Sequence, residues 1–372
     1  MVGWTEPPRR RGLLALVVFA ALALVAAGAV VVTRLASGPD TGRRPDAAAA
    51  SSGVPTATLA PSPTPPPGVS LTGPLNFLIV GVDTRVSVPG WEPHADAVMV
   101  AHVPSGLDRA YLFSLPRDLL VDIPAFPRAG YPGGKTKLTH AMSFGSRVPA
   151  NRKQPNTAQG YELLRATVSG YTGLRIDAGA VLTFNGFDKL VNTLGGVDIY
   201  VDQRVVSLHR RPDGKYRDPA PGGYTGPQMV YEPGERHLNG WQALDYARQR
   251  YTAGGDYTRQ RHQQQLVRAL VRKILDEGLA RQPDRVDQVV AALGDTLIWA
   301  GGGRRIVDVA YALGGLQPDQ FILVGLPGDG VGKGSAYQGE QLKPVGRTFL
   351  TELKAGRADA YLAAHPELRI KS

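Results

Sequence analysis

The 372-residue sequence predicts an α/β protein, a layered α/β/α single domain with a central mixed β-sheet, preceded by one transmembrane helix. Short apolar runs typical of strands alternate with longer segments of helical periodicity. Strands interleaved with helices indicate a layered sheet rather than a helical bundle or a β-sandwich. A long uncharged run near the N-terminus predicts the membrane helix.

The apolar run covers residues 13–33 and contains no charged residue. At about 1.5 Å per residue, such a helix crosses the roughly 30 Å hydrocarbon core of a bilayer. Three arginines at positions 9–11 precede it, so the positive-inside rule places residues 1–12 in the cytoplasm. A cleaved signal peptide is the alternative, but its apolar core is normally about 7–15 residues long. We therefore expect an uncleaved signal anchor of a single-pass cell-membrane protein.

The chain after the anchor divides into a linker and one domain. Residues 34–74 are rich in Pro, Ala and Ser and have little to bury, which predicts an extended extracellular linker. Residues 75–372 are expected to form one extracellular α/β domain. Strands are expected at 75–82, 97–103, 110–115, 180–184, 197–201 and 321–326. Helices are expected at 158–171, 185–194, 239–247, 258–277, 284–299, 303–314 and 340–355, and a surface loop at 210–227.

Composition excludes several kinds of site. The chain carries 42 basic and 32 acidic residues, a net charge of +10, which favours a polyanionic partner without naming it. It has no cysteine, so disulfides and thiolate chemistry are excluded. There is no HExxH zinc motif and no GxSxG nucleophile elbow. The segment GDGVGKGSA at 328–336 departs from the Walker pattern at both its first glycine and its Ser/Thr position.

Two aspartates lie at the junctions of neighbouring predicted strands. Asp83 ends the run NFLIVGVD, and Asp96 begins the next strand. Ligands of α/β sheets gather at strand ends, and Mg²⁺ typically takes one or two protein carboxylates plus phosphate oxygens. The two side chains are therefore candidates to share a divalent cation. The alternative is that each caps a turn or pairs with Arg85.

The segment SLPRDLLVDIP sets Arg117 and Asp118 directly after a strand and Pro116. A rigid approach of this kind suits a side chain that must be aimed, although a structural ion pair between the two residues would look the same in sequence. Lys137 is a weaker candidate, because isolated lysines are common on surfaces.

The segment DYARQRYTAGGDYTRQRHQQQ at 245–265 concentrates positive charge. Arg248 and Arg250 share a face if their segment is extended, and Asp256 after two glycines fits a helix N-cap. In the following helix, Arg259 and Gln263 continue into an apolar stripe and are expected to point inward at a cleft. Inward guanidiniums need acidic partners, which this segment nearly lacks, and their planar forks suit phosphate oxygens. Solvated positions are expected for Arg261, Gln265, Arg268 and Arg272.

These segments in this order resemble the LytR-CpsA-Psr family of bacterial cell-envelope enzymes. The motifs that carry the resemblance are NFLIVGVDTR, HADAVMVAHV, SLPRDLLVDIP, KLTHAMSFG, TFNGFDKLVNTLGGVDIYVD, HLNGWQALDYARQRY and GDYTRQRHQQQ, within residues 75–350. The resemblance implies a phosphotransferase that moves a glycopolymer from a polyprenyl-pyrophosphate carrier to peptidoglycan and leaves a phosphodiester link. It also implies an apolar tunnel for the polyprenyl chain. The polymer stays open among teichoic acid, capsular polysaccharide and arabinogalactan types.

The resemblance also implies roles for individual residues. Asp83 and Asp96 would hold Mg²⁺ or Mn²⁺. The residues implied in pyrophosphate binding are Arg85, Arg117, Lys137, Arg248, Arg250, Arg259 and Gln263. Those implied in catalysis are Arg117, Asp118 and Arg250, with Asp118 or a metal-bound carboxylate as candidate base. Three positions depart from the family pattern, namely His94, Ala97 and His262, where relatives often have a basic residue, a threonine and an arginine.

Two other functions compete with the transferase. The basic charge fits a nucleic-acid-binding regulator such as a membrane-bound transcriptional attenuator, but the membrane anchor would place the arginines outside the cell. We therefore expect no nucleic-acid partner. A non-catalytic receptor for envelope polyanions or lipid carriers would have the same charges and differ only in turnover.

Overall fold

The computed structural model describes residues 71–83, 88, 90–276, 289, 292–304, 309, 313 and 316–370. None of the helices within these ranges is long and apolar enough to cross a membrane. The predicted membrane anchor, nearly all of the predicted linker, Arg85, part of the predicted helix 284–299 and most of the predicted helix 303–314 lie outside the described residues.

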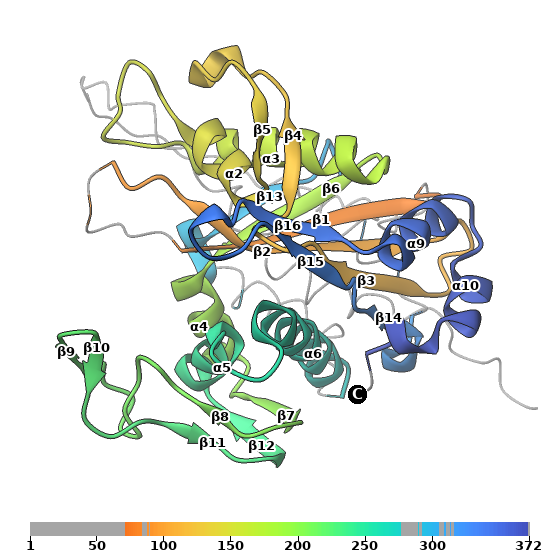
Figure 1. The fold of residues 1–372 in the computed structure, drawn as a ribbon. Coiled ribbons are helices and arrows are strands. Elements are labelled where there is room, and N and C mark those ends of the chain that lie inside the picture. The colour runs from red at the N-terminus through yellow and green to blue at the C-terminus, as the bar shows by residue number, and fades with distance from the viewer. Residues whose placement is uncertain are drawn as a thin grey trace, which may run out of the picture.

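A six-stranded sheet in the order β13-β6-β1-β2-β3-β14 forms the centre of the fold (Figure 1). Its strands are β1 (Leu75–Asp83), β2 (His94–Val103), β3 (Ala110–Ser114), β6 (Ala178–Thr183), β13 (Leu297–Ala300) and β14 (Phe321–Val324). Strand β1 runs parallel to β6 and antiparallel to β2, while β3 runs parallel to β14. The predicted mixed sheet is therefore confirmed.

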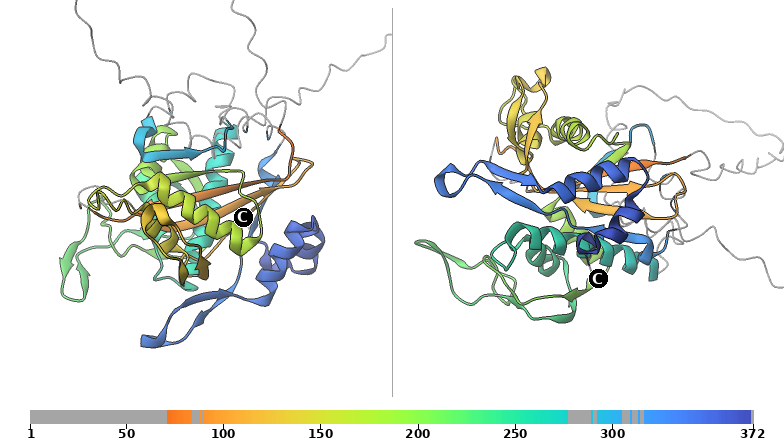
Figure 2. Two further views of the ribbon diagram at one scale, coloured as in Figure 1. Left: turned by 90° about the horizontal axis from the view of Figure 1, so that it is seen from above. Right: turned by 45° about the vertical axis from the view of Figure 1, so that its right-hand side comes forward.

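Helices cover both faces of this sheet (Figures 1 and 2). Side chains of β1 alternate between two cores, with Phe77 and Ile79 on one face and Leu78 and Val80 on the other. The first core includes residues of α4 (Phe184–Thr193), α5 (Gly240–Arg248) and α6 (Gly255–Asp276). The second includes residues of α2 (Thr139–Ser146), α3 (Thr157–Thr172) and α9 (Pro344–Lys354).

A β-bulge interrupts the pairing of β1 with β2 at Asp96. Gly81 pairs with Ala97 and Val82 pairs with Ala95, so Asp96 is an extra residue between them. An extra residue reverses the in–out alternation of a strand. Accordingly Ala95 packs in the same core as Val98, although their positions differ in parity.

The long helix α6 is fixed at both its start and its middle. Gly254 and Gly255 have φ of 86° and 56°, conformations that glycine adopts without strain, and they make the turn into the helix. Gln264 is buried and donates from Nε2 to Ser114 Oγ on β3 at 2.9 Å and to the Val324 carbonyl on β14 at 3.2 Å. These bonds hold the polar first half of α6 against the sheet.

Short two-stranded ribbons surround the central layers. The pairs are β7 (Val197–Val201) with β12 (Gly234–Leu238), β8 (Val205–Val206) with β11 (Val230–Tyr231), β9 (Asp218–Ala220) with β10 (Gly223–Thr225), β4 (Leu120–Ile123) with β5 (Gly134–Lys137), and β15 (Gly328–Val331) with β16 (Gly339–Leu342). The predicted strand 197–201 therefore exists but lies outside the central sheet. Within the predicted loop 210–227, β9 and β10 form a projecting hairpin (Figure 1).

Two helix predictions are wrong at their ends. The helix expected at 284–299 gives way to β13, where Leu297 and Ile298 pair with β6 and complete the sheet edge. The helix expected from 340 begins at Pro344, because Gly339–Leu342 pair with β15 first. A proline at the first helical position marks that start. The C-terminal helix α10 (Ala358–Ala364) is an element that the periodicity did not indicate.

Candidate active site

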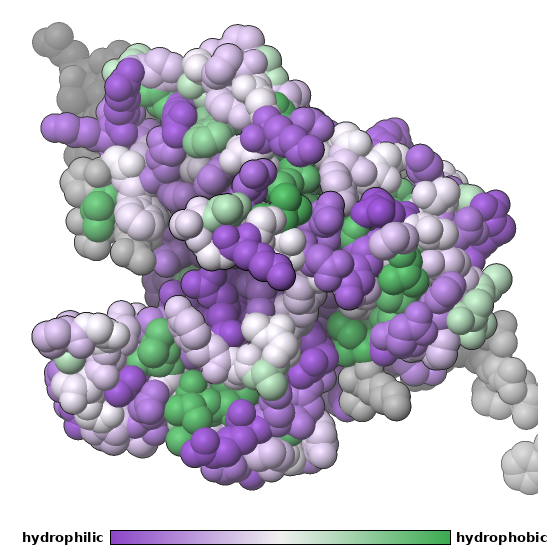
Figure 3. Space-filling model, viewed as in Figure 1, coloured by the Kyte–Doolittle hydropathy of each residue, from purple (hydrophilic) through white to green (hydrophobic). Residues whose placement is uncertain are grey.

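A polar cleft of about 410 Å³ lies where β1, β2 and the C-terminal end of α5 meet. In the space-filling view the surface is hollowed between the part that carries β1 and β2 and the part that carries α5, and hydrophilic residues line the hollow (Figure 3). Its lining residues are Asp83, Trp91, His94, Asp96, Arg117, Phe184, Leu208, His209, Arg248, Gln249, Arg250, Tyr251 and Arg259. Six residues predicted from sequence are thus brought together, namely Asp83, Asp96, Arg117, Arg248, Arg250 and Arg259.

The two aspartates enter the cleft from neighbouring strands. Asp83 shares the strand face of Gly81 and Ile79, which is the face toward α4, α5 and α6. The bulge directs Asp96 into the same cleft. The Oδ2 atom of Asp83 lies 3.8 Å from Arg248 Nη2, and Asp96 Oδ1 pairs with Arg117 Nη1. Both carboxylates therefore already face guanidinium groups.

Arg259 is the most enclosed cation of the cleft, with 4% of its surface exposed. It donates from Nη1 to the Asp96 carbonyl at 2.8 Å and from Nε to Asp256 Oδ1 at 2.9 Å. Burial lowers the pKa of Arg259, and the charges of Asp256 and Asp96 oppose that shift. The segment was expected to offer almost no acidic partners, and one of its two acidic residues, Asp256, lies one helical turn before Arg259 and pairs with it.

Asp256 also differs from its predicted role. It lies in the first turn of α6, after Gly255, and its second oxygen accepts from Gln260 Nε2 at 3.0 Å. Its carboxylate thus joins two side chains of the same helix instead of serving as the N-cap. The result is a rigid first turn that presents Arg259 to the cleft.

Asp118 and Lys137 lie next to the polar cleft but do not line it. Lys137 Nζ is 3.4 Å from Asp118 Oδ1, and Arg117 Nε is 3.8 Å from the same oxygen. Lys137 also lies 4.8 Å from the ring centre of Tyr337, near the hairpin of β15 and β16. The structure therefore brings Asp118 and Lys137 together behind Arg117 rather than with the other predicted pyrophosphate ligands.

Arg248 and Arg250 bracket the end of α5 and differ in their surroundings. Arg248 is in the last turn of the helix, and its guanidinium carbon lies 4.5 Å from the ring centre of Phe184. Gln249 then adopts an extended conformation. Arg250 is exposed and forms no hydrogen bond or ion pair with any residue that the structure describes. A free guanidinium at the cleft has its donors available for an anion.

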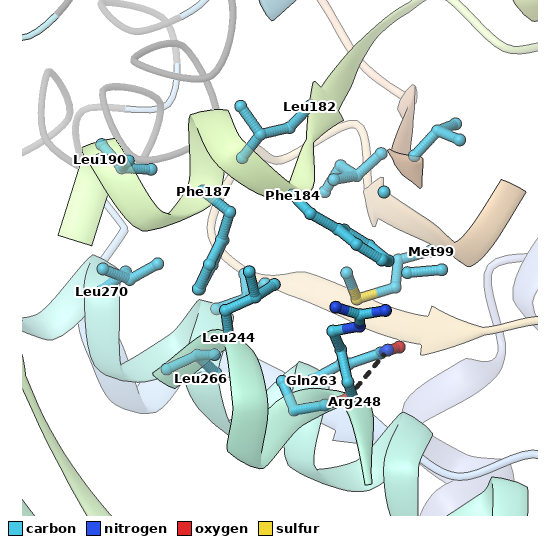
Figure 4. Close-up of a pocket in the computed structure, with 16 residues that line it drawn as sticks. Met99, Leu182, Phe184, Phe187, Leu190, Leu244, Arg248, Gln263, Leu266 and Leu270 are labelled. Atoms are coloured by element: carbon cyan, nitrogen blue, oxygen red, sulfur yellow. Dashed lines mark hydrogen bonds between the residues drawn. The ribbon is translucent and has the colours of Figure 1, made fainter. Parts of the chain in front are cut away.

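An apolar pocket of about 100 Å³ adjoins the cleft and shares Arg248 and Phe184 with it (Figure 4). Its other lining residues are Ile79, Val80, Gly81, Ala97, Met99, Leu182, Phe187, Leu190, Leu244, Ala247, Gln263, Leu266, Val267 and Leu270. Gln263 belongs to this pocket and not to the polar cleft. Its Nε2 donates to the Ala247 carbonyl at 3.3 Å, so its amide links α6 to α5.

His262 points away from the polar cleft. It is fully buried, stacks on Tyr246 with ring centres 4.4 Å apart, and its Nε2 lies 3.1 Å from Asp202 Oδ1. Burial lowers the pKa of His262 and Asp202 opposes that shift. Its neighbour Arg261, expected to be solvated, also pairs with Asp202, at 2.7 Å. His262 is therefore part of the packing of α6 and not a ligand of the cleft.

Six cleft residues were not singled out from the sequence: Trp91, Phe184, Leu208, His209, Gln249 and Tyr251. His209 lies in the segment after β8, which reads as an irregular loop, so no periodicity singled it out. Behind it, buried Asp245 accepts hydrogen bonds from Ser207 Oγ, Tyr231 Oη and Gln249 Nε2, each at 2.9 Å. Burial raises the pKa of Asp245.

Asp83 and Asp96 fit a magnesium ion in the chemistry of their oxygen ligands. Within the described part of the chain, no group of three or more His, Asp or Glu side chains is placed to hold a metal. Two carboxylates agree with a cation whose remaining ligands are phosphate oxygens and water, and not with a closed protein site. Each carboxylate would then share its charge between the cation and its arginine.

Comparison with known proteins gives consistent results. Residues 47–337 match the LytR_cpsA_psr family. The chain is 27% identical over 263 residues to the polyisoprenyl-teichoic acid–peptidoglycan teichoic acid transferase TagU of Enterococcus faecalis, over 69% of this chain and 73% of the relative. It is also 27% identical to biofilm regulatory protein A of Streptococcus mutans, over 54% of this chain and 44% of that relative.

Solved structures agree in fold. The structure described as TagT bound to LIIa-WTA matches with a TM-score of 0.52 at 20% identity, over 76% of this chain and 89% of that chain. The family match covers most of the residues described above, including both aspartates and the four arginines of the cleft. The chain belongs to the LytR-CpsA-Psr family.

Proposed function

We propose that this chain is a phosphotransferase that moves a glycopolymer from a polyprenyl-pyrophosphate carrier to a hydroxyl group of peptidoglycan. The observation that carries the proposal is the junction at Arg248 and Phe184, where a cationic cleft and an apolar pocket meet. A ligand that fills both must have a polyanionic group attached directly to a hydrocarbon chain. A polyprenyl pyrophosphate has that composition.

The charges of the polar cleft favour a diphosphate. Four arginines, Arg117, Arg248, Arg250 and Arg259, face Asp83 and Asp96, so these six side chains sum to 4 − 2 = +2. Guanidinium groups bind phosphate oxygens through two parallel hydrogen bonds. Arg250 has every donor available and therefore binds the phosphate oxygens directly. Arg259 is held in place by Asp256 and therefore supplies a fixed positive potential.

The apolar pocket favours a hydrocarbon chain next to that diphosphate. Aliphatic side chains from β1, β2 and α6 line it, and Gln263 has its amide bonded to backbone. Removing a prenyl chain from water contributes about 25 cal/mol per Å² of apolar surface. The pocket takes the first prenyl units and the remainder stays with the membrane.

The activities named for relatives support a glycopolymer as the transferred group. One is a teichoic acid transferase, and another is TagT bound to LIIa-WTA. We extend that class of polymer, and peptidoglycan as the acceptor, to this chain. A carrier loaded with a teichoic acid, a capsular polysaccharide or an arabinogalactan would fit the cleft equally well. The reason is that the cleft contacts the diphosphate that all three loaded carriers share.

The cleft residues act by binding and by charge. The acceptor oxygen attacks the phosphorus that bears the polymer, and the leaving prenyl phosphate carries away the electron pair of the broken P–O bond. Arg250 and Arg117 stabilise the charge that develops on the phosphoryl oxygens and on the leaving group. A magnesium ion held by Asp83 and Asp96 would supply further charge neutralisation when bound.

We also propose that residues 13–33 anchor the chain in the cell membrane with the cleft outside. The uncharged run and the preceding arginines support this topology. Protease accessibility of the C-terminal domain on intact cells tests it. A domain protected until the membrane is broken would overturn the topology and favour the regulator.

Reconstitution tests the transfer. The full chain in detergent is incubated with a lipid-linked glycan, peptidoglycan and Mg²⁺, and both prenyl phosphate and polymer-bound peptidoglycan are measured. We expect both products to appear together. If the chain retains the lipid-linked glycan tightly but releases no prenyl phosphate, the transferase proposal is rejected. The chain would then be a non-catalytic receptor.

A further inference from the structure

His209 is an imidazole of the polar cleft that the transfer described above does not use. Its ring nitrogens form no hydrogen bond with any residue in the described ranges. Its ring meets Tyr224 edge to face, with centres 5.0 Å apart and planes at 82°. The ring is thus positioned by packing and has its nitrogens available for a ligand.

The backbone around His209 is fixed by buried hydrogen bonds. The amide groups of His209 and Arg210 both donate to Ser207 Oγ, at 3.2 and 2.9 Å. Leu208 N donates to Gln249 Oε1 at 3.0 Å, and Ser207 donates in turn to Asp245. Ser207 is fully buried. Supporting hydrogen bonds of this kind hold a functional side chain in one geometry.

The surroundings of His209 keep it neutral. Burial lowers its pKa, and the guanidiniums of Arg248, Arg210, Arg217 and Arg250 lower it further. The other charged or titratable side chains of the cleft and of the contacting ribbon are Asp83, His94, Asp96, Arg117, Arg259, Tyr251 and Tyr224. A neutral imidazole carries a lone pair and accepts a proton, which an arginine does not.

We infer that His209 is the general base that accepts the proton of the acceptor hydroxyl during transfer. The inference rests on the proposed function. As the acceptor oxygen forms its bond to phosphorus, its proton passes to a ring nitrogen of His209. The bond from phosphorus to the bridging oxygen breaks, and prenyl phosphate leaves with that electron pair. His209 then releases its proton to water.

Substrate binding strengthens this base. A bound diphosphate neutralises Arg248 and Arg250, and with them part of the electrostatic cause that lowers the pKa of His209. The pKa of the imidazole therefore rises when the substrate arrives. Proton affinity is greatest when there is a hydroxyl proton to accept.

The carboxylates of the site are already engaged. Asp118 lies beside Lys137 and Arg117, outside the lining of the cleft. Asp83 and Asp96 each face an arginine. His94 donates from Nδ1 to the Glu92 carbonyl at 2.9 Å, so its Nε2 is a second imidazole acceptor of the cleft. Of these two imidazoles, His209 is the one that lies among Arg248 and Arg250, the arginines that the diphosphate binds.

The first experiment is a pH–rate profile of the full chain with lipid-linked glycan and peptidoglycan. His209→Gln should lower kcat by about 10²- to 10⁴-fold, leave KM for the lipid-linked glycan nearly unchanged, and remove the acid limb of the profile. The matched control is His365→Gln, an exposed histidine paired with Glu367, which should behave as wild type. A His209→Gln enzyme that keeps the acid limb or its full kcat overturns the inference.

The second experiment needs no turnover. One ring proton signal of the seven histidines is assigned to His209 as the signal lost in His209→Gln, and it is titrated with and without inorganic pyrophosphate. We expect a midpoint below the ordinary value of about 6.5 that moves upward with pyrophosphate. An ordinary midpoint, or one that does not move when pyrophosphate is bound, overturns the inference.

The two experiments separate this inference from the proposed function. If the wild-type chain releases no prenyl phosphate, the transferase fails, whatever His209 does. If the wild type turns over and His209→Gln keeps both its rate and its acid limb, the transferase stands and His209 is not its base.

Discussion

The polar cleft and the apolar pocket lie side by side on one face of the sheet but are built differently. Charged side chains from strand ends and helix ends line the cleft, where backbone leaves regular structure. The pocket is lined by the middle of the same strands and by the apolar stripe of α6. Arg248 and Phe184 belong to both. The fold thus places a polar site and an apolar site so close together that single side chains border both.

Removing Arg250 should have the largest effect on the polar cleft. Arg250→Ala deletes a guanidinium that has no partner among the described residues, so we expect a loss of transfer of about 10²- to 10³-fold. The free energy of unfolding should change by less than about 0.5 kcal/mol, because the side chain is exposed.

The control for Arg250→Ala is Arg357→Ala, an exposed arginine paired with Glu352 away from the cleft. It should transfer at the wild-type rate. Asp96→Ala should also abolish transfer while the circular dichroism spectrum is kept. Full activity in Arg250→Ala or Asp96→Ala would reject the assigned cleft.

The cleft and the pocket both require the sheet beneath them to be folded. The buried His102 limits the pH range over which that sheet is stable. Burial lowers the pKa of His102 from 6.5 to about 4, with Asp177 opposing. The unfolded chain therefore binds a proton that the folded chain refuses, and stability is lost as pH falls from about 6.5 toward 4. At about 1.36 kcal/mol per unit, the loss is about 3 kcal/mol.

Urea unfolding at pH 7 and pH 4.5 checks this, with His102→Gln as the comparison. Glutamine does not titrate, so the variant removes the imidazole whose Nδ1 donates to Asn76 Oδ1 in the wild type. The variant should lose less stability on acidification than the wild type. Equal losses in the two proteins would assign the acid sensitivity to other groups.

A larger side chain in the pocket should separate tail binding from head binding. Val267→Phe places a larger side chain of α6 in the pocket and so reduces the space for a prenyl chain. We expect about tenfold weaker binding of a long-chain prenyl diphosphate, measured by calorimetry, because overpacking costs about 1–3 kcal/mol. Inorganic pyrophosphate should bind as it does to the wild type. An equal loss for both ligands would mean that the tail does not use this pocket.

The smallest effect is expected behind the cleft, at Asp118. Asp118→Asn keeps the shape and removes the charge that faces Lys137 and Arg117, whose side chains are about one-quarter exposed. A partly exposed pair contributes about 1 kcal/mol or less, so transfer should fall only a fewfold. A loss as large as that of Arg250→Ala would show that Asp118 takes part in the chemistry.

Local patterns made much of the fold and the site predictable. Buried strand runs located five of the six central strands, and the row Arg259, Gln263, Leu266, Leu270 gave the inward face of α6. That row divides between the two regions, with Arg259 in the cleft and Gln263 in the pocket. Periodicity identifies a face of a helix, but it does not indicate where along that face the environment changes from polar to apolar.

The features of the fold and of the site that could not be predicted depend on contacts between segments far apart in the sequence. Nothing near Asp96 indicates that its partner is Arg117, 21 residues away. The run that forms β13 reads equally well as helix, since four apolar residues fit both patterns, and only the free edge of β6 decides. His209 lies in an irregular segment, so its place in the cleft depends on the buried contacts of Ser207 and Asp245.

The bulge at Asp96 also bears on which changes the chain tolerates. Deleting that one position would make the pairing regular, because Ala95 would directly precede Ala97 and both would keep their present partners, Val82 and Gly81. The neighbouring residues would therefore keep their faces, and the strand end would lose only its kink and the carboxylate of Asp96. The bulge thus adds one residue to the cleft without shifting the register of the strands that support it.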